Sequence, residues 1–175
     1  MDKNVLPFLG LDDMKSADRF ILFLTVALVL AGCANVGNVR FRVGERNHQA
    51  LLCVPKKTKP PYPAVIFNHG MVVDLHGLSG AIDRGYSLDT FCQALVGDGF
   101  LAFLPVRNGL EALSTQLAIV LGAYSHVGGM KNVDPGRIAV AGFSRGALLT
   151  LIAARHGLGA KAFVLIATAP GPKSE

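Results

Sequence analysis

Apolar and polar residues alternate along the chain in short runs that predict strands first and helices later. Val39 to Val43 alternates apolar and charged side chains, as a half-buried strand does, and Gly44 to Asn47 has the composition of a turn. Gln49 to Val54 predicts the second arm of a hairpin. After a Pro-rich loop, the short apolar run Ala64 to Phe67 predicts a strand buried on both faces.

The remaining chain continues as strands and helices in turn. We expect an irregular Gly-rich segment from Asn68 to Tyr86, then a helix from a Ser87 cap to about Asp98 with Gly99 as its stop, and a strand Phe100–Leu104 ended by Pro105. A helix follows, with apolar positions from Leu110 to Tyr124. The last predicted elements are a turn Asp134–Arg137, a strand Ile138–Ala141, a helix Ala147–His156 closed by Gly157, and a strand Ala162–Ala167. This order predicts an α/β fold: a mostly parallel sheet with helices on both faces and an antiparallel N-terminal hairpin.

Composition narrows the class of protein. The chain has 175 residues, 51% of them apolar, which is enough for one domain with a sizeable core. Its net charge of +5 is modest, and Lys56, Lys57 and Lys59 lie in the Pro-rich loop without interleaved aromatic residues, so we expect no nucleic-acid partner. The three cysteines fit no zinc spacing, and we expect no metal and no cofactor.

The N-terminal segment predicts export. The uncharged apolar run from Phe20 to Ala31 follows Lys15 and Arg19, and it is too short for a membrane span, which needs about 20 residues. The run ends in Leu30 to Cys33, which resembles the lipobox of bacterial lipoproteins. That resemblance implies cleavage before Cys33 and a lipid on its thiol. An ordinary secretory signal, or a core helix with a chance cysteine, is the alternative.

These observations divide the chain into three parts. We expect a signal peptide over residues 1–32, with Met14 as the true start, a tether over 33–38 that begins at the lipidated Cys33, and a partial α/β domain over 39–175. The lipid would hold the protein in a bacterial cell envelope. In a Gram-negative host we expect the outer membrane, because Ala34 is not the Asp that holds some lipoproteins at the inner membrane. Cys53 and Cys92 would then form one disulfide or remain as two buried thiols.

The sequence Gly142-Phe143-Ser144-Arg145-Gly146 matches G-x-S-x-G, the pattern of a nucleophile elbow. Four apolar strand residues precede it and an apolar helix follows at once, which is the strand–turn–helix context that the motif requires. We therefore expect Ser144 to be a nucleophile in a sparsely populated backbone conformation. The alternative is a Gly-rich turn whose serine caps the helix.

An oxyanion hole needs two donors close to this serine. We expect the backbone N–H of Arg145, the residue after the nucleophile, and the N–H of Met71, in the loop after strand Ala64–Phe67. His69 lies in the same loop, and we expect it to support the loop. It is a poor candidate for the catalytic base, because in folds with this elbow the histidine follows the serine along the chain.

The residues from Tyr62 to Gly70, from Val133 to Gly146 and from Lys161 to Val164 resemble the dienelactone-hydrolase-like branch of the α/β-hydrolases. The resemblance covers about residues 39–170. It implies the N-terminal portion of an α/β-hydrolase fold and hydrolysis of small-molecule esters without a metal. Dienelactone hydrolases proper use a cysteine nucleophile, so Ser144 fits an esterase or a lipase-like enzyme better.

The partners of Ser144 are missing from the expected place. In this fold an acid and then a histidine follow the nucleophile, but only Glu175 and His156 follow it here. His156 ends the helix after the serine, where a solvated role fits better. We expect the chain to be truncated and inactive alone. Two hypotheses remain: a serine esterase when complete, or a catalytically inactive lipoprotein that uses the hydrolase scaffold for binding.

Overall fold

The computed structural model describes residues 35–107 and 111–170. The elements in chain order are β1 (Asn35–Val43), β2 (Arg46–Val54), β3 (Tyr62–Asn68), α2 (Met71–Ile82), α3 (Leu88–Gly97), β4 (Leu101–Val106), α4 (Leu113–Gly128), β5 (Val133–Phe143), α5 (Arg145–Arg155) and β6 (Ala162–Ile166). The predicted signal peptide, Met14 and Cys33 lie outside the described residues.

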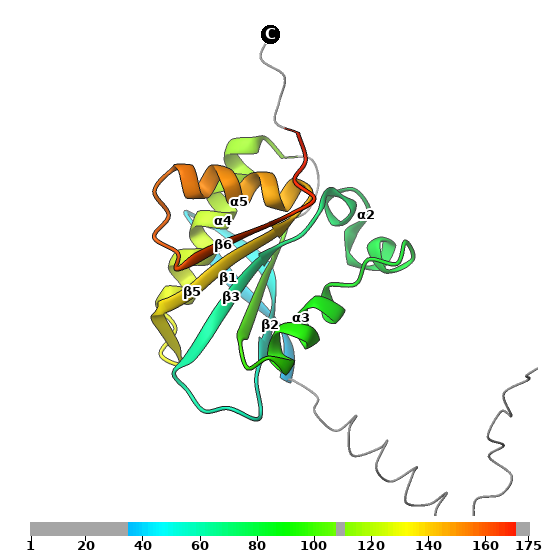
Figure 1. Cartoon of the computed structure of the whole chain (residues 1–175). Coiled ribbons are helices and arrows are strands. Elements are labelled where there is room, and N and C mark those ends of the chain that lie inside the picture. The colour runs from blue at the N-terminus through cyan, green and yellow to red at the C-terminus, as the bar shows by residue number, and fades with distance from the viewer. Residues whose placement is uncertain (1–34, 108–110, 171–175) are drawn as a thin grey trace, which may run out of the picture. The chain divides into compact units, whose positions relative to one another are not determined.

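Six strands form one mixed sheet in the order β1-β2-β4-β3-β5-β6 (Figure 1). Strands β1 and β2 form an antiparallel hairpin, and β2 pairs antiparallel with β4. Strands β4, β3, β5 and β6 run parallel to one another. The predicted α/β class, with an antiparallel hairpin at one edge of a mostly parallel sheet, is confirmed.

Helices cover both faces of the sheet, because alternate residues of the buried strands point to opposite sides. Val65 and Phe67 of β3 pack in a cluster with residues of α2 and α3. Their neighbours Ala64 and Ile66 pack on the other face with residues of α4. Helix α5 lies on that same side and packs against α4. A disulfide joins Cys53 of β2 to Cys92 of α3, so the structure selects the disulfide over two thiols.

Several predicted boundaries need correction. Strand β1 begins at Asn35, so it takes in residues 35–38, which we expected in the tether. Strand β4 continues through Pro105, because its pairing with β3 ends at Phe103 and a neighbour remains on one side only, where proline is tolerated. Ser87 stands at the N-cap position of α3, but its side chain makes no capping hydrogen bond.

The largest difference lies in the segment expected to be irregular. Met71–Ile82 forms helix α2, with a kink at Gly77, where φ is 69°. Buried Val73 and Ala81 pack this helix onto the sheet, so tertiary contacts outweigh the low helix propensity of its glycines. The region beyond the loop that follows β3 is therefore ordered as a broken helix.

Candidate active site

The turn between β5 and α5 has the geometry of a nucleophile elbow. Ser144 connects strand to helix with φ of 52° and ψ of −115°. A side chain at positive φ is strained, so the expected sparsely populated conformation is confirmed. Ser144 occupies the N-cap position, yet its hydroxyl makes no capping hydrogen bond. The helix-cap alternative therefore lacks the interaction that would define it.

The two glycines of the motif bring three backbone segments together. A Cβ at Gly142 would overlap the carbonyl group of Gly146 across the turn. A Cβ at Gly146 would overlap the carbonyl oxygen of Asn68, at the end of β3. Glycine is thus required at both positions by the close approach of backbone, and the elbow lies directly against the loop that follows β3.

The backbone of Ser144 is fixed from several directions. Its N–H donates to the carbonyl oxygen of Ile166 in β6 at 2.9 Å. Its carbonyl oxygen accepts from Ala147 at 3.0 Å and Leu148 at 3.2 Å in α5, and from Ala169 at 3.1 Å. Strand β6 and the residues after it therefore help to hold the strained serine.

The two predicted oxyanion donors are the first residues of two helices. Met71 begins α2 and Arg145 begins α5, and the first N–H groups of a helix have no partner within it. Among the described residues, neither N–H donates a hydrogen bond to a backbone carbonyl. Both helix N-termini add partial positive charge at this edge of the sheet.

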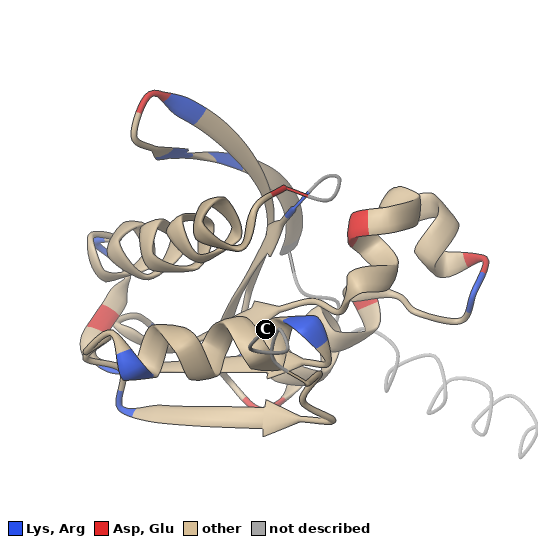
Figure 2. Ribbon diagram, turned by 90° about the horizontal axis from the view of Figure 1, so that it is seen from above, with Lys and Arg blue, Asp and Glu red and all other residues tan. Residues whose placement is uncertain are grey.

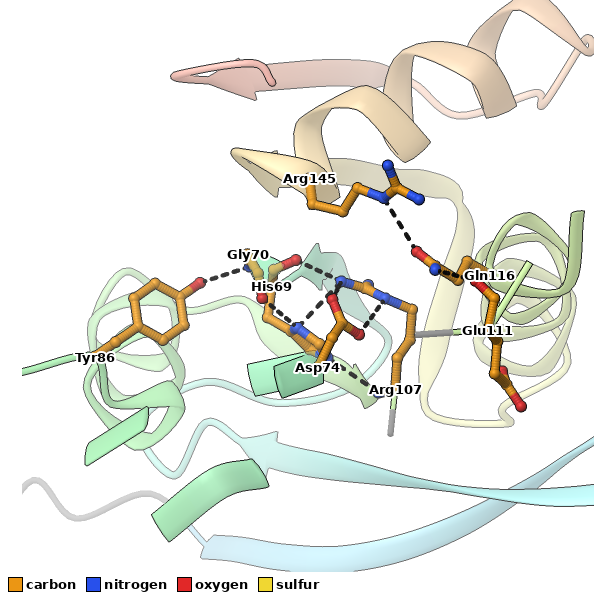
Figure 3. Close-up of polar contacts among 8 residues, drawn as sticks. All are labelled: His69, Gly70, Asp74, Tyr86, Arg107, Glu111, Gln116 and Arg145. Carbon is orange, nitrogen blue, oxygen red and sulfur yellow. Dashed lines mark hydrogen bonds and ion pairs between the residues drawn. The ribbon is translucent and has the colours of Figure 1, made fainter. Parts of the chain in front are cut away.

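His69 is a buried side chain with both ring nitrogens in contact with polar partners (Figure 3). Its Nε2 accepts from the backbone N–H of Arg107 at 3.0 Å, so Nδ1 carries the proton of the neutral ring and donates to the carbonyl oxygen of Gly70 at 2.9 Å. Nη2 of Arg107 lies 3.1 Å from the same Nδ1, but two donors do not form a hydrogen bond with each other. Burial, and then the charge of Arg107, lowers the pKa of His69 to about 3. Both ring nitrogens are thus occupied by the backbone of Gly70 and Arg107, and neither is left for the proton of Ser144.

Two residues that our sequence analysis missed lie beside this histidine. Arg107 follows β4 and Asp74 lies in the first turns of α2, with both side chains 1% exposed. The Asp74 carboxylate accepts from Nε of Arg107 at 3.2 Å and from Nη2 at 3.1 Å. Burial raises the pKa of Asp74, and the Arg107 guanidinium offsets part of that rise. In the sequence, each of these charges stands alone within or directly after an apolar run. Such a charge is expected to be buried and to need a partner, which was the available signal.

Three further hydrogen bonds lie around this network (Figure 3). The N–H of Gly70 donates to the hydroxyl of Tyr86 at 3.2 Å. The Arg145 side chain donates through Nε to Oε1 of Gln116 at 3.3 Å, and Gln116 donates to the carbonyl oxygen of Glu111 at 2.6 Å. The side chain of Arg145 is thus directed toward α4, while its backbone N–H stays at the elbow.

The other histidines lie in places that do not suit a base for Ser144. His156 is the C-cap of α5, about 18 Å from Ser144 at 1.5 Å per residue. The rings of His48 and His126 pack against Phe41. His76 is exposed on α2. Among the described residues, the structure brings the strained turn at Ser144 against the loop after β3 and assembles no complete triad.

A hollow with several basic residues lies beside the β1–β2 hairpin and the end of β4. Its volume is about 540 Å³, and it is lined by Arg40, Arg46, Asn47, His48, Gln49, Val106 and Glu111. Figure 2 shows the arginine positions of the β1–β2 hairpin as blue segments. Within residues 35–107 and 111–170, no group of three or more His, Cys, Asp or Glu side chains is placed to hold a metal ion. No helix in that part of the chain is long and apolar enough to cross a membrane.

Comparison with known proteins gives a match in structure. No family model and no curated protein matches this sequence. A structure of a protein assigned as a dienelactone hydrolase, from Klebsiella pneumoniae subsp. pneumoniae MGH 78578, matches with a TM-score of 0.61 and 23% identity over 81% of this chain and 63% of that chain.

Two esterase structures match in the same way. EstE1, a thermophilic carboxylesterase cloned from a metagenomic library, has a TM-score of 0.61 and 23% identity over 91% of this chain and 57% of its own. A hyperthermophilic esterase from the archaeon Pyrobaculum calidifontis has a TM-score of 0.64 and 22% identity over 92% of this chain and 55% of its own.

At these identities the similarity defines the fold. The chain has an α/β-hydrolase-like fold, as predicted, and spans 55% to 63% of the length of these three structures. The structures that it resembles are those of esterases and of a protein assigned as a dienelactone hydrolase, which agrees with the resemblance found in the sequence.

Proposed function

We propose that this chain carries the nucleophile and the oxyanion hole of a serine hydrolase that acts on carboxylic esters. The observation that carries the proposal is the backbone of Ser144, held at positive φ between β5 and α5 and pressed against the loop after β3. Strain of this kind persists where the surrounding structure enforces it, and it is concentrated at functional sites. The esterase structures with the same fold support the assignment of substrate class.

The chemistry follows from this arrangement. The Ser144 hydroxyl oxygen attacks the acyl carbon of the ester while a histidine takes its proton. The carbonyl oxygen becomes an oxyanion, which the N–H groups of Arg145 and Met71 stabilise. The histidine returns the proton to the leaving alcohol, and water then releases the acid from the acyl-enzyme. No metal takes part in these steps.

We propose that the histidine and its carboxylate partner come from a segment that packs beside β6. Among the described strands, β6 pairs with β5 alone, and Val164, Leu165 and Ile166 are 47%, 41% and 42% exposed. An apolar edge strand of this kind is a place where further structure adds. Because Ser144 is hydrogen-bonded to the end of β6, a segment there would reach the elbow.

The test compares Ser144→Ala with Ser125→Ala, an exposed serine on α4, in the full-length protein encoded by the gene. We expect Ser144→Ala to reduce kcat/KM for p-nitrophenyl esters by several orders of magnitude and to abolish labelling by a fluorophosphonate. Ser125→Ala should retain both activities. Full activity in Ser144→Ala would refute the nucleophile, and an unreactive, stably folded wild type would favour the inactive binding protein.

We also propose that the protein is anchored in the bacterial cell envelope by a lipid on Cys33. The lipobox-like sequence supports this, and the Cys53–Cys92 disulfide is typical of an oxidising compartment. In a Gram-negative host we expect the outer membrane. Mass spectrometry should find an acylated Cys33 at the mature N-terminus, and Cys33→Ser should release the protein from the membrane fraction. A mature chain that begins at Ala34, or an unmodified Cys33, would contradict the anchor.

A further inference from the structure

The oxyanion loop is held by an ion pair that lies behind it. Asp74 and Arg107 are 33 residues apart in the sequence and meet with their side chains almost fully excluded from solvent. Burying two charges is costly, and apolar residues of similar volume commonly give equal or greater stability. Stability alone therefore does not account for a charged pair at this position. The hydrogen bonds of the pair to the loop indicate a role in orienting that loop.

Arg107 fixes the peptide between His69 and Gly70 from one side. Its Nη2 donates to the His69 carbonyl oxygen at 2.6 Å. On the other side of the same peptide, the Gly70 N–H donates to Tyr86 at 3.2 Å. Because the C=O and N–H of a trans peptide point in opposite directions, these two bonds define the orientation of the peptide plane.

The next peptide, between Gly70 and Met71, is oriented through the His69 ring. Arg107 holds that ring by its backbone N–H, and Nδ1–H of the ring donates to the Gly70 carbonyl oxygen at 2.9 Å. That oxygen also accepts from the N–H of Val73 at 3.3 Å. With this carbonyl turned toward His69 and α2, the Met71 N–H of the same planar unit must point the opposite way.

We propose that Asp74 and Arg107 are positioning residues of the oxyanion hole. The Asp74 carboxylate orients the guanidinium, the guanidinium holds the His69 carbonyl, and the two oriented peptides direct the Met71 N–H toward the oxygen of an ester bound at Ser144. The inference rests on the proposed function for its catalytic half. Its structural half concerns the loop alone and can be tested without a substrate.

The test uses two substitutions that keep the size of the side chain and alter the pair. Asp74→Asn removes the charge that orients Arg107, and Arg107→Lys keeps the positive charge but loses the planar, two-pronged contact. Removal of a whole oxyanion donor costs about 10²–10³ in kcat. For a donor that is present but misdirected, we expect both variants to lose about 10- to 100-fold in kcat, with KM changed less than about threefold.

The matched control is Asp134→Asn, which alters a partly solvated ion pair with Arg137 at 2.6 Å in the first residues of β5. It should leave kcat and KM unchanged. All assays are made well below the melting temperature of each variant, so a purely structural role would lower the melting temperature and leave kcat unchanged. A wild-type kcat in folded Asp74→Asn and Arg107→Lys would overturn the proposal.

A second measurement needs no catalysis. Hydrogen exchange of the Gly70 amide, followed by NMR, reports the bond to Tyr86, and the ¹⁵N shifts of His69 report which ring nitrogen carries the proton. We expect Asp74→Asn to speed Gly70 exchange at least about tenfold and Asp134→Asn to leave it unchanged. Unchanged exchange and ring shifts would overturn the proposal even if no ester is cleaved. A wild type without Ser144-dependent turnover would overturn the proposed function, and the exchange data would still decide whether Asp74 holds the loop.

Discussion

The two ends of strand β5 are built in opposite ways. At its amino end, Asp134 and Arg137 form an ion pair whose side chains are 33% and 53% exposed. At its carboxyl end, Gly142 and Gly146 bring the elbow into backbone contact with the loop after β3. An ion pair again lies close by, but there it is buried and hydrogen-bonded to that loop.

The difference indicates which parts of the fold tolerate substitutions. A solvated strand end can relax around a new side chain, and its charges are largely screened by water. The elbow cannot relax without separating β3 from β5, and a buried charge that loses its partner has no water to replace it. Equivalent substitutions at the two ends of β5 should therefore have very different effects.

The largest effect is expected for Gly146→Ala. The added Cβ would overlap the Asn68 carbonyl group, so the loop after β3 would have to move away from the elbow. We expect a loss of at least about 4 kcal/mol in the free energy of unfolding, or no folded protein. Gly136→Ala is the control, because its Cβ would meet only the exposed Asp134 carboxylate at 3.3 Å, which can turn aside. The measurement is urea unfolding of both variants. Similar urea midpoints would contradict the close contact between Gly146 and the Asn68 carbonyl group.

The next effect concerns the two ion pairs. Arg107→Leu leaves the Asp74 carboxylate buried without its partner, and we expect a loss of about 3–5 kcal/mol in the free energy of unfolding. The double variant Asp74→Leu with Arg107→Leu should recover most of that loss, because no unpaired charge remains. Arg137→Leu should leave the urea midpoint unchanged. A double variant as unstable as Arg107→Leu alone would show that the loss comes from packing and not from the isolated charge.

The same contrast explains what could be predicted from the sequence. Runs such as Ala64–Phe67 locate strands within a few residues because burial on both faces of a sheet imposes an apolar run. The elbow was predictable because its strand, turn and helix are consecutive in the chain. Helix α2 was not, because Gly77 and Gly80 lower its propensity and its order comes from residues packed against the sheet.

The pair of Asp74 and Arg107 could not be predicted either. The two residues are adjacent only once α2 follows β3 and β4 lies beside β3 in the sheet. A pattern along the chain indicates that each charge needs a partner, but it does not identify the partner. The exposed pair of Asp134 and Arg137 is only three residues apart, and it lies within β5, where the sequence analysis expected a turn.

The smallest effect is expected from pH, through His69. Its folded-state pKa of about 3 lies below the ordinary value of 6.5, so between these two values the unfolded chain binds a proton that the folded chain does not. The contribution of His69 to stability is therefore complete above about pH 6.5 and falls as the pH decreases toward 3. At about 1.4 kcal/mol per pH unit, about 2 kcal/mol should be lost between pH 7 and pH 5.

Asp74 acts in the opposite sense, because its raised pKa makes its contribution decrease as the pH rises. That carboxyl remains in His69→Gln, so the comparison of wild type with His69→Gln isolates the histidine. The free energy of unfolding of His69→Gln should change by about 2 kcal/mol less than that of wild type between these two pH values, while His76→Gln, at an exposed position on α2, should follow wild type. Equal pH dependence in wild type and His69→Gln would mean that the ring accepts a proton in the folded protein, and it would then be open to a role as the base.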